Sequence, residues 1–414
     1  MSVINVLSRC AGISLIVLIA ASNAAAESEL TLAEAEHLAL EHAPALAQAN
    51  ANVKAAAERT VSAGRLPDPQ LTLGAINVPT DTYRLNQEDM TMVEVGVRQA
   101  FPPGDTLAAR TRRAEQEHAR SRERLETERR DLLRQVRQTW FDLYYAERAQ
   151  RLLESGRKLA RRDVAAAEAR RRAAQDTSRA VFQARQQLAR LDERLPMLHA
   201  QAERARALLA RWIGEAARAP LPDTLPALPA PEDFDPRGNP EWRATQAGFE
   251  AARAEVDMAR QEYKPGWMLD LSYGFRQPMP DGTSRPNMVT AMVTFDLPVF
   301  RAKRQDRRLA ESEAREAAAR YESEDKQREL VAMHQTLRAE HDALAERVRV
   351  YEQELLPALR HEAQDASGGF ARELTERRAA RMKEIDAEIE LLRLRVDLAK
   401  TQAELLYLTG EPQS

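Results

Sequence analysis

Hydrophobic and polar residues are arranged in two ways along the chain, and each arrangement indicates a different kind of structure. Long stretches in which Ala and Leu interleave with Arg and Glu follow a helical pattern and have the composition of long helices packed side by side. Four short segments instead alternate between apolar and polar residues, which predicts β-strands with one apolar face. These segments are residues 70–78, 91–101, 267–276 and 287–297. We therefore expect a mostly α-helical chain with a small β part.

The chain repeats its landmarks at a constant shift of 196 residues, the separation of Pro44 from Pro240. The same shift places three more residues of the first half on matching residues of the second half: Pro69 on Pro265, Pro102 on Pro298 and Gly214 on Gly410. A constant shift over most of each half predicts a duplication in which each half is one structural unit. A segment rich in Pro and acidic residues separates the halves and is typical of an extended linker. The predicted organisation is repeat 1 (residues 27–219), linker (220–239) and repeat 2 (240–414).

Each repeat is predicted to contain a helix, a strand pair, a long helix, a tip and a last helix. The first helix is expected to start after Thr31, with Glu34 as the partner of this capping residue, and to continue to about Gly64. The long helix continues to about Ala173 in repeat 1 and to about Gly368 in repeat 2. The two shorter helices together match the long one in length, at about 1.5 Å per residue. We therefore expect a long antiparallel rod with both strand pairs at one end and both tips at the other.

The N-terminus has the pattern of a secretory signal peptide. An apolar run follows Arg9 and ends at the small residues 24–26, which predicts cleavage after Ala26 and assigns residues 1–26 to the signal. This run is too short for a membrane-spanning helix, and no later segment has a long uncharged apolar run. The single cysteine, Cys10, lies before the apolar run, so we expect no disulfide or cysteine metal site in the mature chain.

Charge and candidate chemistry argue against an enzyme or a nucleic-acid-binding protein. The net charge is only −3, and the seven histidines are scattered, with no phosphate-binding or nucleophile motif. His37 and Glu41 have the i, i+4 spacing of metal ligands, but helices often show this spacing by coincidence. The aromatic residues Trp140, Phe141 and Tyr144 are expected to pack at a helix crossing. We predict no catalytic activity, no cofactor, no bound metal and no nucleic-acid partner.

The alternating segments predict a shared pore. Each has about 9–11 residues, which is long enough for a tilted strand to cross a bilayer. Unpaired strand edges cannot face hydrocarbon, and four strands are too few to close a barrel, so several copies would have to share one. Charged residues on the polar face would then line the lumen, and the candidates are Glu94, Arg98, Asp270, Arg276 and Asp296. The alternative is a pair of soluble hairpins whose apolar faces cover a core.

Four motifs of the first half carry a family resemblance: Leu30-Thr31-Leu32-Ala33-Glu34-Ala35, Ala39-Leu40-Glu41-His42-Ala43-Pro44, Ala63-Gly64-Arg65-Leu66-Pro67-Asp68-Pro69 and Gln99-Ala100-Phe101-Pro102-Pro103-Gly104. With the repeated element order, they make the chain similar to the TolC family of outer-membrane efflux channels over essentially the whole mature sequence. The last two motifs look most like the heavy-metal branch, the CzcC- and CusC-like proteins.

The resemblance implies a TolC-like duplicated unit of long antiparallel coiled-coil helices plus four transmembrane β-strands. In a homotrimer these strands would complete a 12-stranded barrel in the cell outer membrane, among its lipids, above a periplasmic helical extension. It also implies a non-enzymatic channel subunit of a tripartite efflux system that conducts solutes, here heavy-metal cations. The implied partners are a periplasmic adaptor (membrane fusion protein) and an inner-membrane pump of the resistance-nodulation-division (RND) type.

The helix tips would be the adaptor contacts according to this resemblance. The tip candidates are Gln175, Asp176, Thr177, Ser178, Gly368, Gly369, Phe370, Glu373 and Glu376. Family members narrow the periplasmic entrance with acidic rings near the second tip, whereas this sequence has Thr375 and Arg378 at those places. Glu373 and Glu376 are the nearest carboxylates.

Two alternative functions stay open. The conduit could serve multidrug efflux or type I secretion instead of metal efflux. Met268, Met288 and Met292 fall on the polar strand face, and thioether sulfur suits soft metal ions, although scattered methionines are more often filler. The second alternative is a soluble periplasmic coiled-coil adaptor, which would need a compact β domain with its own core.

Overall fold

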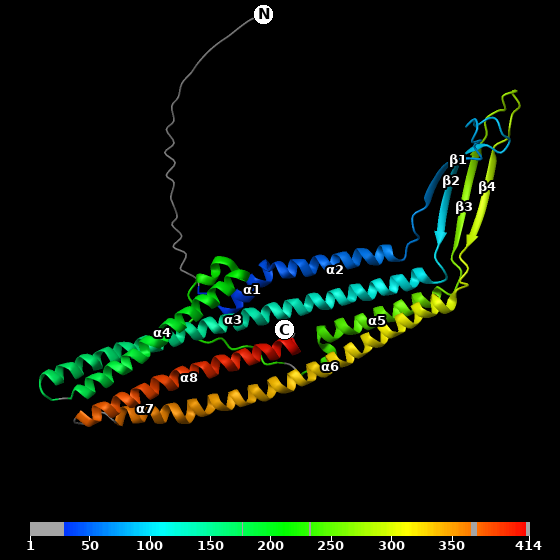
Figure 1. Cartoon of the computed structure of the whole chain (residues 1–414). Coiled ribbons are helices and arrows are strands. Elements are labelled where there is room, and N and C mark those ends of the chain that lie inside the picture. Colours follow the sequence, from blue (N-terminus) through cyan, green and yellow to red (C-terminus); the bar gives the residue numbers. More distant parts are fainter. Residues whose placement is uncertain (1–28, 176, 232, 366–370, 411–414) are drawn as a thin grey trace, which may run out of the picture.

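The computed structural model describes residues 29–175, 177–231, 233–365 and 371–410. The predicted signal peptide lies outside these residues, as do four tip candidates: Asp176, Gly368, Gly369 and Phe370. The molecule is an elongated bundle of helices with both strand pairs at one end and both helix tips at the other (Figure 1). This is the rod that the helix lengths predicted.

The elements of the first repeat follow the predicted order. They are α1 (Leu32–His42), α2 (Pro44–Ala63), β1 (Gln70–Ile76), β2 (Met92–Phe101), α3 (Thr106–Arg172), α4 (Ser178–Ile213) and a short 3₁₀ turn, η1 (Gly214–Arg218). The predicted cap of the first helix is confirmed, because the Thr31 hydroxyl accepts a hydrogen bond from the backbone N–H of Glu34 at 3.2 Å. Gly214 ends α4 with φ of +61°, a conformation that glycine adopts without strain.

The single first helix predicted up to Gly64 is wrong, because the chain bends at Pro44 and forms two helices. Ala43 is extended, with φ of −68° and ψ of 117°. A residue that precedes proline is disfavoured in the helical conformation because the proline ring crowds its backbone. Pro44 then begins α2 at a first-turn position, where its missing N–H leaves no intrahelical bond unmade.

The second repeat follows a short linker and has the same order of elements. Its elements are η2 (Pro236–Gly238), α5 (Pro240–Gln261), β3 (Trp267–Phe275), β4 (Met288–Phe295), η3 (Arg301–Lys303), α6 (Gln305–Val350), η4 (Tyr351–Leu355), α7 (Leu356–Asp365) and α8 (Ala371–Thr409). Gly410 follows α8 with φ of +90°, so both last helices end at a glycine, as the sequence predicted. All four strands are slightly shorter than predicted.

The second long helix is also interrupted, whereas the sequence predicted it to be continuous. The π-helical turn η4 separates α6 from α7, two residues before Pro357. Proline cannot donate to the carbonyl four residues back, and its ring crowds that carbonyl, which a π turn can accommodate. By contrast, α4 contains Pro196 and continues through it.

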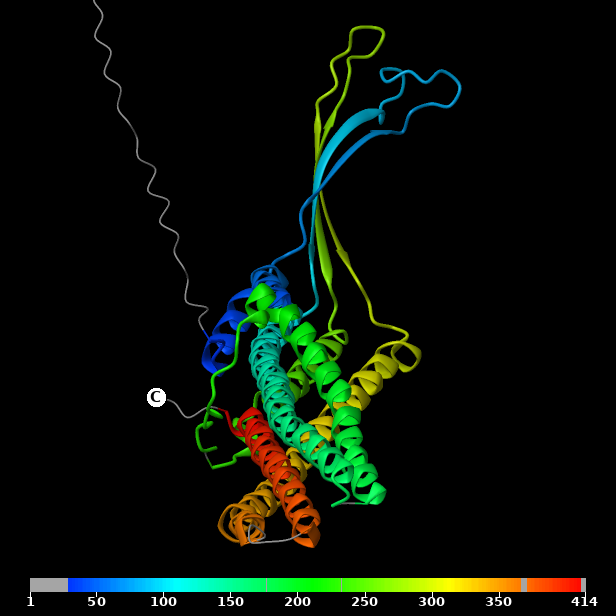
Figure 2. The ribbon, with the colours of Figure 1, turned by 90° about the vertical axis from the view of Figure 1, so that its left-hand side faces the viewer.

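The elements have the same lateral order at three levels of the rod. The sheet has the order β1-β2-β3-β4. Below it the neighbouring helices are α2, α3, α5 and α6, and towards the tips they are α4, α3, α8 and α7 (Figure 1). The chain therefore has two lateral edges, one formed by β1, α2 and α4, and the other by β4, α6 and α7. Figure 2 shows the two hairpins projecting together beyond the helices.

The main core lies where α1, α3, α4 and α8 meet in the middle of the rod. Trp140 and Phe141 are fully buried there, and the predicted packing of these aromatic residues at a helix crossing is confirmed. The Trp140 indole N–H donates to the Leu30 carbonyl at 3.1 Å, and the ring stacks on Tyr144 with centroids 5.5 Å apart. This cluster joins the two repeats, because Val396 of α8 also belongs to it.

Ion pairs connect the helices along their solvated surfaces. Arg206 of α4 lies 2.6 Å from Glu147 of α3, and Arg194 of α4 lies 2.6 Å from Asp386 of α8. In the ranges that the structure describes, no helix has the long, weakly charged apolar run that a membrane-spanning helix needs.

Candidate functional site: the sheet and the helix tips

The strand register sorts side chains onto two faces of the sheet. One cross-strand row is apolar in all four strands and consists of Leu71, Val97, Leu271 and Ala291. The adjacent row is small or polar and consists of Thr72, Gly96, Ser272 and Thr290. Rows of these two kinds alternate because successive residues of a strand point to opposite faces. The sheet therefore has one apolar face and one polar face.

The apolar face is exposed in the single chain. Leu73 is 70% exposed and Val289 is 76% exposed, and Phe295 is 58% exposed. At the helix end of this face, Phe101 stacks on Trp267 with ring centroids 3.9 Å apart. The alternative in which the hairpins cover a core of their own chain is therefore wrong for the described structure. An apolar face of this kind has to be covered by lipid or by another molecule.

The polar face holds three of the five lumen candidates on the strands themselves. Arg98 and Asp270 are cross-strand partners, and the Arg98 guanidinium donates to the Asp270 carboxylate at 2.9 Å. Glu94 lies four residues before Arg98 on the same face, opposite Gly274. Arg98 and Asp270 thus neutralise each other, whereas no described basic residue forms an ion pair with Glu94.

The other two lumen candidates lie just beyond the strand ends. Asp296 follows β4, and its backbone N–H donates to the Gly266 carbonyl at 2.9 Å. Arg276 follows β3, and its guanidinium donates to the backbone carbonyls of Asp89 and Pro286. Only 8% of the Arg276 side chain is exposed. Its hydrogen bonds join the backbone of the two hairpin loops at the end of the sheet.

Arg285 is a functional candidate that the sequence did not identify. This buried side chain lies in the loop between β3 and β4 and donates to the carbonyl of Gln277 at 2.6 Å. It also donates to the carbonyls of Glu88 and Leu85 in the loop between β1 and β2. Together with Arg276 it joins the two hairpin loops, and we call these two arginines the loop clasp. A lone arginine in a turn-rich loop gives no sequence signal for such a role.

Replacing Arg285 by methionine is expected to loosen both hairpin loops. The variant removes donors from three carbonyls, and each buried carbonyl left without a partner costs about 1–3 kcal/mol unless water reaches it. We expect limited proteolysis to cut both loops faster than in the wild-type protein. The control is Arg84→Met, which changes an exposed arginine in the same pair of loops. Equal cleavage rates in Arg285→Met and Arg84→Met would show that the clasp does not order the loops.

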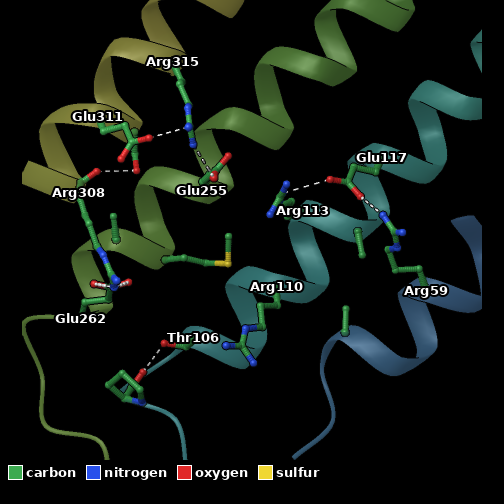
Figure 3. A pocket seen from close by; sticks show the side chains of 16 residues that line it. Arg59, Thr106, Arg110, Arg113, Glu117, Glu255, Glu262, Arg308, Glu311 and Arg315 are labelled. Atoms are coloured by element: carbon green, nitrogen blue, oxygen red, sulfur yellow. Dashed lines mark hydrogen bonds and ion pairs between the residues drawn. The ribbon is translucent and has the colours of Figure 1, made fainter. Parts of the chain in front are cut away.

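A charged pocket of about 600 Å³ lies directly below the sheet, between α2, α3, α5 and α6 (Figure 3). Arg308 lies 2.8 Å from Glu262, and Arg315 lies 2.6 Å from Glu311. On the opposite wall, Glu117 lies between two arginines, Arg59 and Arg113, at 3.2 and 3.1 Å. Most of the lining charges are compensated by neighbours on adjacent helices. The pocket is therefore a hydrated surface with balanced charges. General acid–base chemistry needs a carboxyl group that is free to exchange its proton, and the carboxylates described above are held in ion pairs.

The two tips lie together at the end opposite the sheet (Figure 1). At the first tip, Gln175 donates its backbone N–H to the Arg170 carbonyl at 2.9 Å. Thr177 caps α4, which begins at Ser178, by accepting a hydrogen bond from the Ala180 N–H at 3.4 Å. At the second tip, Glu373 and Glu376 lie in the first turns of α8.

The helices offer little for metal binding in the parts that the structure describes. The His37 imidazole lies 3.9 Å from the Glu41 carboxylate, and both side chains are well exposed. Within the described ranges, no group of three or more His, Cys, Asp or Glu residues could hold an ion. His37 and Glu41 are therefore an ordinary i, i+4 surface pair.

Ion pairs and hydrogen bonds join the linker to the helices that it crosses. Asp223 lies 2.6 Å from Arg148 and 3.1 Å from Arg151, and hydrogen bonds from these two guanidiniums hold the pKa of Asp223 below its usual value. Farther along, the amide of Gln402 donates to the Leu228 carbonyl at 3.0 Å. The linker thus connects α3 of the first repeat with α8 of the second.

A second polar contact fixes the end of α8. Burial and the hydrogen bond to the Glu241 carboxylate raise the pKa of Tyr407, so its hydroxyl stays protonated and remains a donor. Lys326 of α6 lies 3.3 Å from the same carboxylate. Glu241 of α5 therefore holds α6 and α8 together.

Comparison with protein families gives a match over most of the chain. The family model described as outer membrane efflux protein matches residues 36–215 and 237–411. These two segments correspond to the two repeats, and most of the linker lies between them. Among curated proteins, Protein CyaE of Bordetella pertussis (strain Tohama I) is 28% identical over 295 residues. That match covers 66% of this chain and 60% of CyaE, so the chain spans less than two thirds of this relative.

Solved structures show the same fold at low sequence identity. CusC has a TM-score of 0.78 and 16% identity, with 93% of each chain covered. The outer membrane protein VceC of Vibrio cholerae has a TM-score of 0.77 and 19% identity, with 92% of this chain and 96% of VceC covered. The open state of the Neisseria gonorrhoeae MtrE outer membrane channel has a TM-score of 0.71 and 20% identity, with 92% and 89% covered.

Proposed function

The chain belongs to the outer membrane efflux protein family, that is, to the TolC-like channels, and from this premise we propose that it is the outer-membrane channel subunit of a tripartite efflux system. In this role it conducts solutes from an inner-membrane pump and a periplasmic adaptor to the outside. The observation that carries the proposal is the sheet, which has an exposed apolar face and two open edges, β1 and β4.

The open edges support a closed ring of several copies. A strand edge in hydrocarbon leaves backbone N–H and C=O groups without partners, so a sheet that enters lipid has to close. Pairing β1 of one copy with β4 of the next would repeat head to tail until the ring closes. The same step would place α2 and α4 of one copy beside α6 and α7 of the next. Following the resemblance to TolC, we propose a homotrimer with a 12-stranded barrel in the outer membrane and the helices in the periplasm.

The two faces of the sheet support a water-filled lumen. The apolar face would contact lipid, and the polar face, with Glu94, Asp270 and Arg98, would line the pore. Asp296 and Arg276 would lie at its two ends. A lumen of this kind conducts passively, and the energy for transport would come from the pump. The tips, from Gln175 to Ser178 and at Glu373 and Glu376, would contact the adaptor and open on contact.

Heavy-metal cations are the proposed cargo. The support comes from the two motifs at residues 63–69 and 99–104, which look most like the CzcC- and CusC-like branch. Strand register also puts Met292 in the same row as Asp270 on the polar face, and Met288 in the row of Glu94. A strain that lacks the gene should become sensitive to metal salts and regain resistance with the wild-type gene. Sensitivity to drugs alone, with unchanged metal resistance, would favour the multidrug alternative.

Purified protein is expected to form detergent-resistant trimers that dissociate on heating and that conduct ions in planar bilayers. The variant Glu94→Gln should lower the preference for cations over anions, because it removes a lumen charge that has no basic partner. The reversal potential in a salt gradient measures this preference. A Thr72→Ser variant on the same face serves as the control. Trimers that do not conduct even after Glu373 and Glu376 are neutralised would contradict the channel proposal.

A further inference from the structure

The connection between β4 and α6 combines exposed apolar side chains with exposed basic ones. We call residues 297–304 the β4–α6 turn. Phe300 is 76% exposed, and Leu297 and Val299 are also largely exposed. The three basic residues of the turn are exposed as well, and these are Arg301, Lys303 and Arg304. In Figure 2 the turn (yellow) projects sideways where the strands meet the helices.

The apolar residues of the β4–α6 turn continue the apolar face of the sheet. Phe295 lies on that face, and Leu297 follows the same alternation two residues farther along the chain. The chain then bends, because the N–H of Val299 donates to the carbonyl of Leu297 at 2.9 Å. Val299 and Phe300 therefore extend the exposed apolar surface beyond the end of the strand.

The basic residues of the turn have no carboxylate partner in the part of the chain that the structure describes. Arg301 donates its Nε–H to the carbonyl of Pro298 at 3.2 Å, which orders the turn but leaves the positive charge unbalanced. Arg308, four residues after Arg304, lies by contrast 2.8 Å from Glu262. Unpaired cationic groups beside exposed apolar groups suit a bilayer surface, where acyl chains take the apolar groups and phosphates meet the charges.

The corresponding turn of the first repeat lacks this combination. At the shift of 196 residues it spans residues 101–108, which include no basic residue. Phe101 stacks on Trp267, and Asp105 lies 3.8 Å from Lys264. Both turns connect a strand to a long helix, so that connection alone does not require exposed apolar and basic side chains. The β4–α6 turn therefore needs a further explanation.

We propose that the β4–α6 turn binds the phosphate headgroup of an anionic phospholipid at the periplasmic surface of the outer membrane. The inference rests on the proposed function, which puts the strands in the bilayer and the helices in the periplasm. The turn then lies at the level of the headgroups of the periplasmic leaflet. Leu297, Val299 and Phe300 enter the acyl-chain boundary, and the three basic side chains contact phosphate oxygens.

Quenching of tryptophan fluorescence by brominated lipids measures which lipid lies beside the turn. Trp267 pairs with Phe295 at the strand end, so its fluorescence reports on this region. The full-length trimer is reconstituted into phosphatidylcholine vesicles with a minor fraction of phosphatidylglycerol, and separate samples carry the bromine on one lipid or the other. The wild-type protein should prefer phosphatidylglycerol by about threefold or more and should lose this preference at high salt.

Two variants with the same loss of charge test whether the turn is responsible. The test variant combines the substitutions Arg301→Gln, Lys303→Gln and Arg304→Gln and should abolish the preference. The control variant removes three exposed charges from the tip half of α3 and combines Lys158→Gln, Arg161→Gln and Arg162→Gln. The control should keep the wild-type preference. If the test variant does not form trimers, Lys303→Gln alone replaces it and should weaken the preference.

The outcomes separate this inference from the proposed function. Equal quenching by the two lipids in the wild-type protein, or a preference that the test variant retains, would overturn the inference alone. Loss of the preference on adding sodium phosphate at constant ionic strength would assign the turn to free phosphate instead. No preference in the wild-type protein, together with loss of trimers in the test variant only, would assign it to contact between neighbouring copies. An absence of quenching by either lipid would contradict the outer-membrane location itself.

Discussion

Replacing Leu73 by arginine is expected to remove the protein from the outer membrane, whereas the same replacement at the adjacent Thr72 is expected to leave it there. The two residues are neighbours in β1 but lie in different cross-strand rows. Leu73 pairs with Val95 on the apolar face, and Thr72 pairs with Gly96 on the polar face. The two variants therefore add the same charge to the same strand and differ only in the face that receives it.

The expected loss of Leu73→Arg from the outer membrane is large because the apolar face of the sheet would contact hydrocarbon. An arginine on the lipid face near the bilayer midplane costs about 2–4 kcal/mol. A homotrimer would carry this cost in each of its copies. An arginine at position 72 would instead extend into water, where it costs little, and Gly96 opposite leaves room for it.

Membrane fractionation and unheated gel electrophoresis measure the outcome. Leu73→Arg should be depleted from the outer-membrane fraction and should lack the heat-dissociable trimer. Thr72→Arg should match the wild-type protein in both assays and change only the ion preference of the channel. If the two variants behave alike, the sheet faces do not separate lipid from water, and the channel proposal loses its main support.

The sequence predicted the elements and the faces of the strands because both depend on local periodicity. Alternation along one strand is enough to put Glu94 and Arg98 on the same face. It cannot show that Arg98 pairs with Asp270, because these residues are 172 positions apart and meet only through the register between β2 and β3. The face of a lumen residue was therefore predictable, and its ion-pair partner was not.

The loop clasp was missed for a similar reason. Arg285 bonds carbonyls of Glu88 and Leu85, which lie 197 and 200 positions away, and no local pattern encodes such contacts. The two wrong helix predictions have a different origin, since the chain breaks at Pro44 and before Pro357 but continues helically through Pro196. Tertiary packing decides which proline a helix tolerates, and the sequence alone does not contain that packing.

Replacing Trp140 by alanine is expected to destabilise the helical part more than any other single truncation of its core. The side chain is fully buried and contacts Phe141 edge-to-face at 5.6 Å in addition to its stack on Tyr144. Loss of a buried tryptophan costs about 3–5 kcal/mol, from lost burial and from the cavity that remains. The variant also leaves the Leu30 carbonyl without its donor.

Trp140→Phe separates the contribution of ring packing from that of the hydrogen bond to Leu30. It keeps most of the ring packing and removes the indole donor. The expected order of melting temperature is wild type, then Trp140→Phe, then Trp140→Ala, measured by circular dichroism at one protein concentration, since trimer stability depends on concentration. The loss of stability should extend beyond α3, because the cluster around Trp140 includes Leu32 of α1, Leu209 of α4 and Val396 of α8. Trp140→Ala should therefore melt both repeats together. A variant that melts at the wild-type temperature, or melts only in the first repeat, would show that the two halves do not share this core.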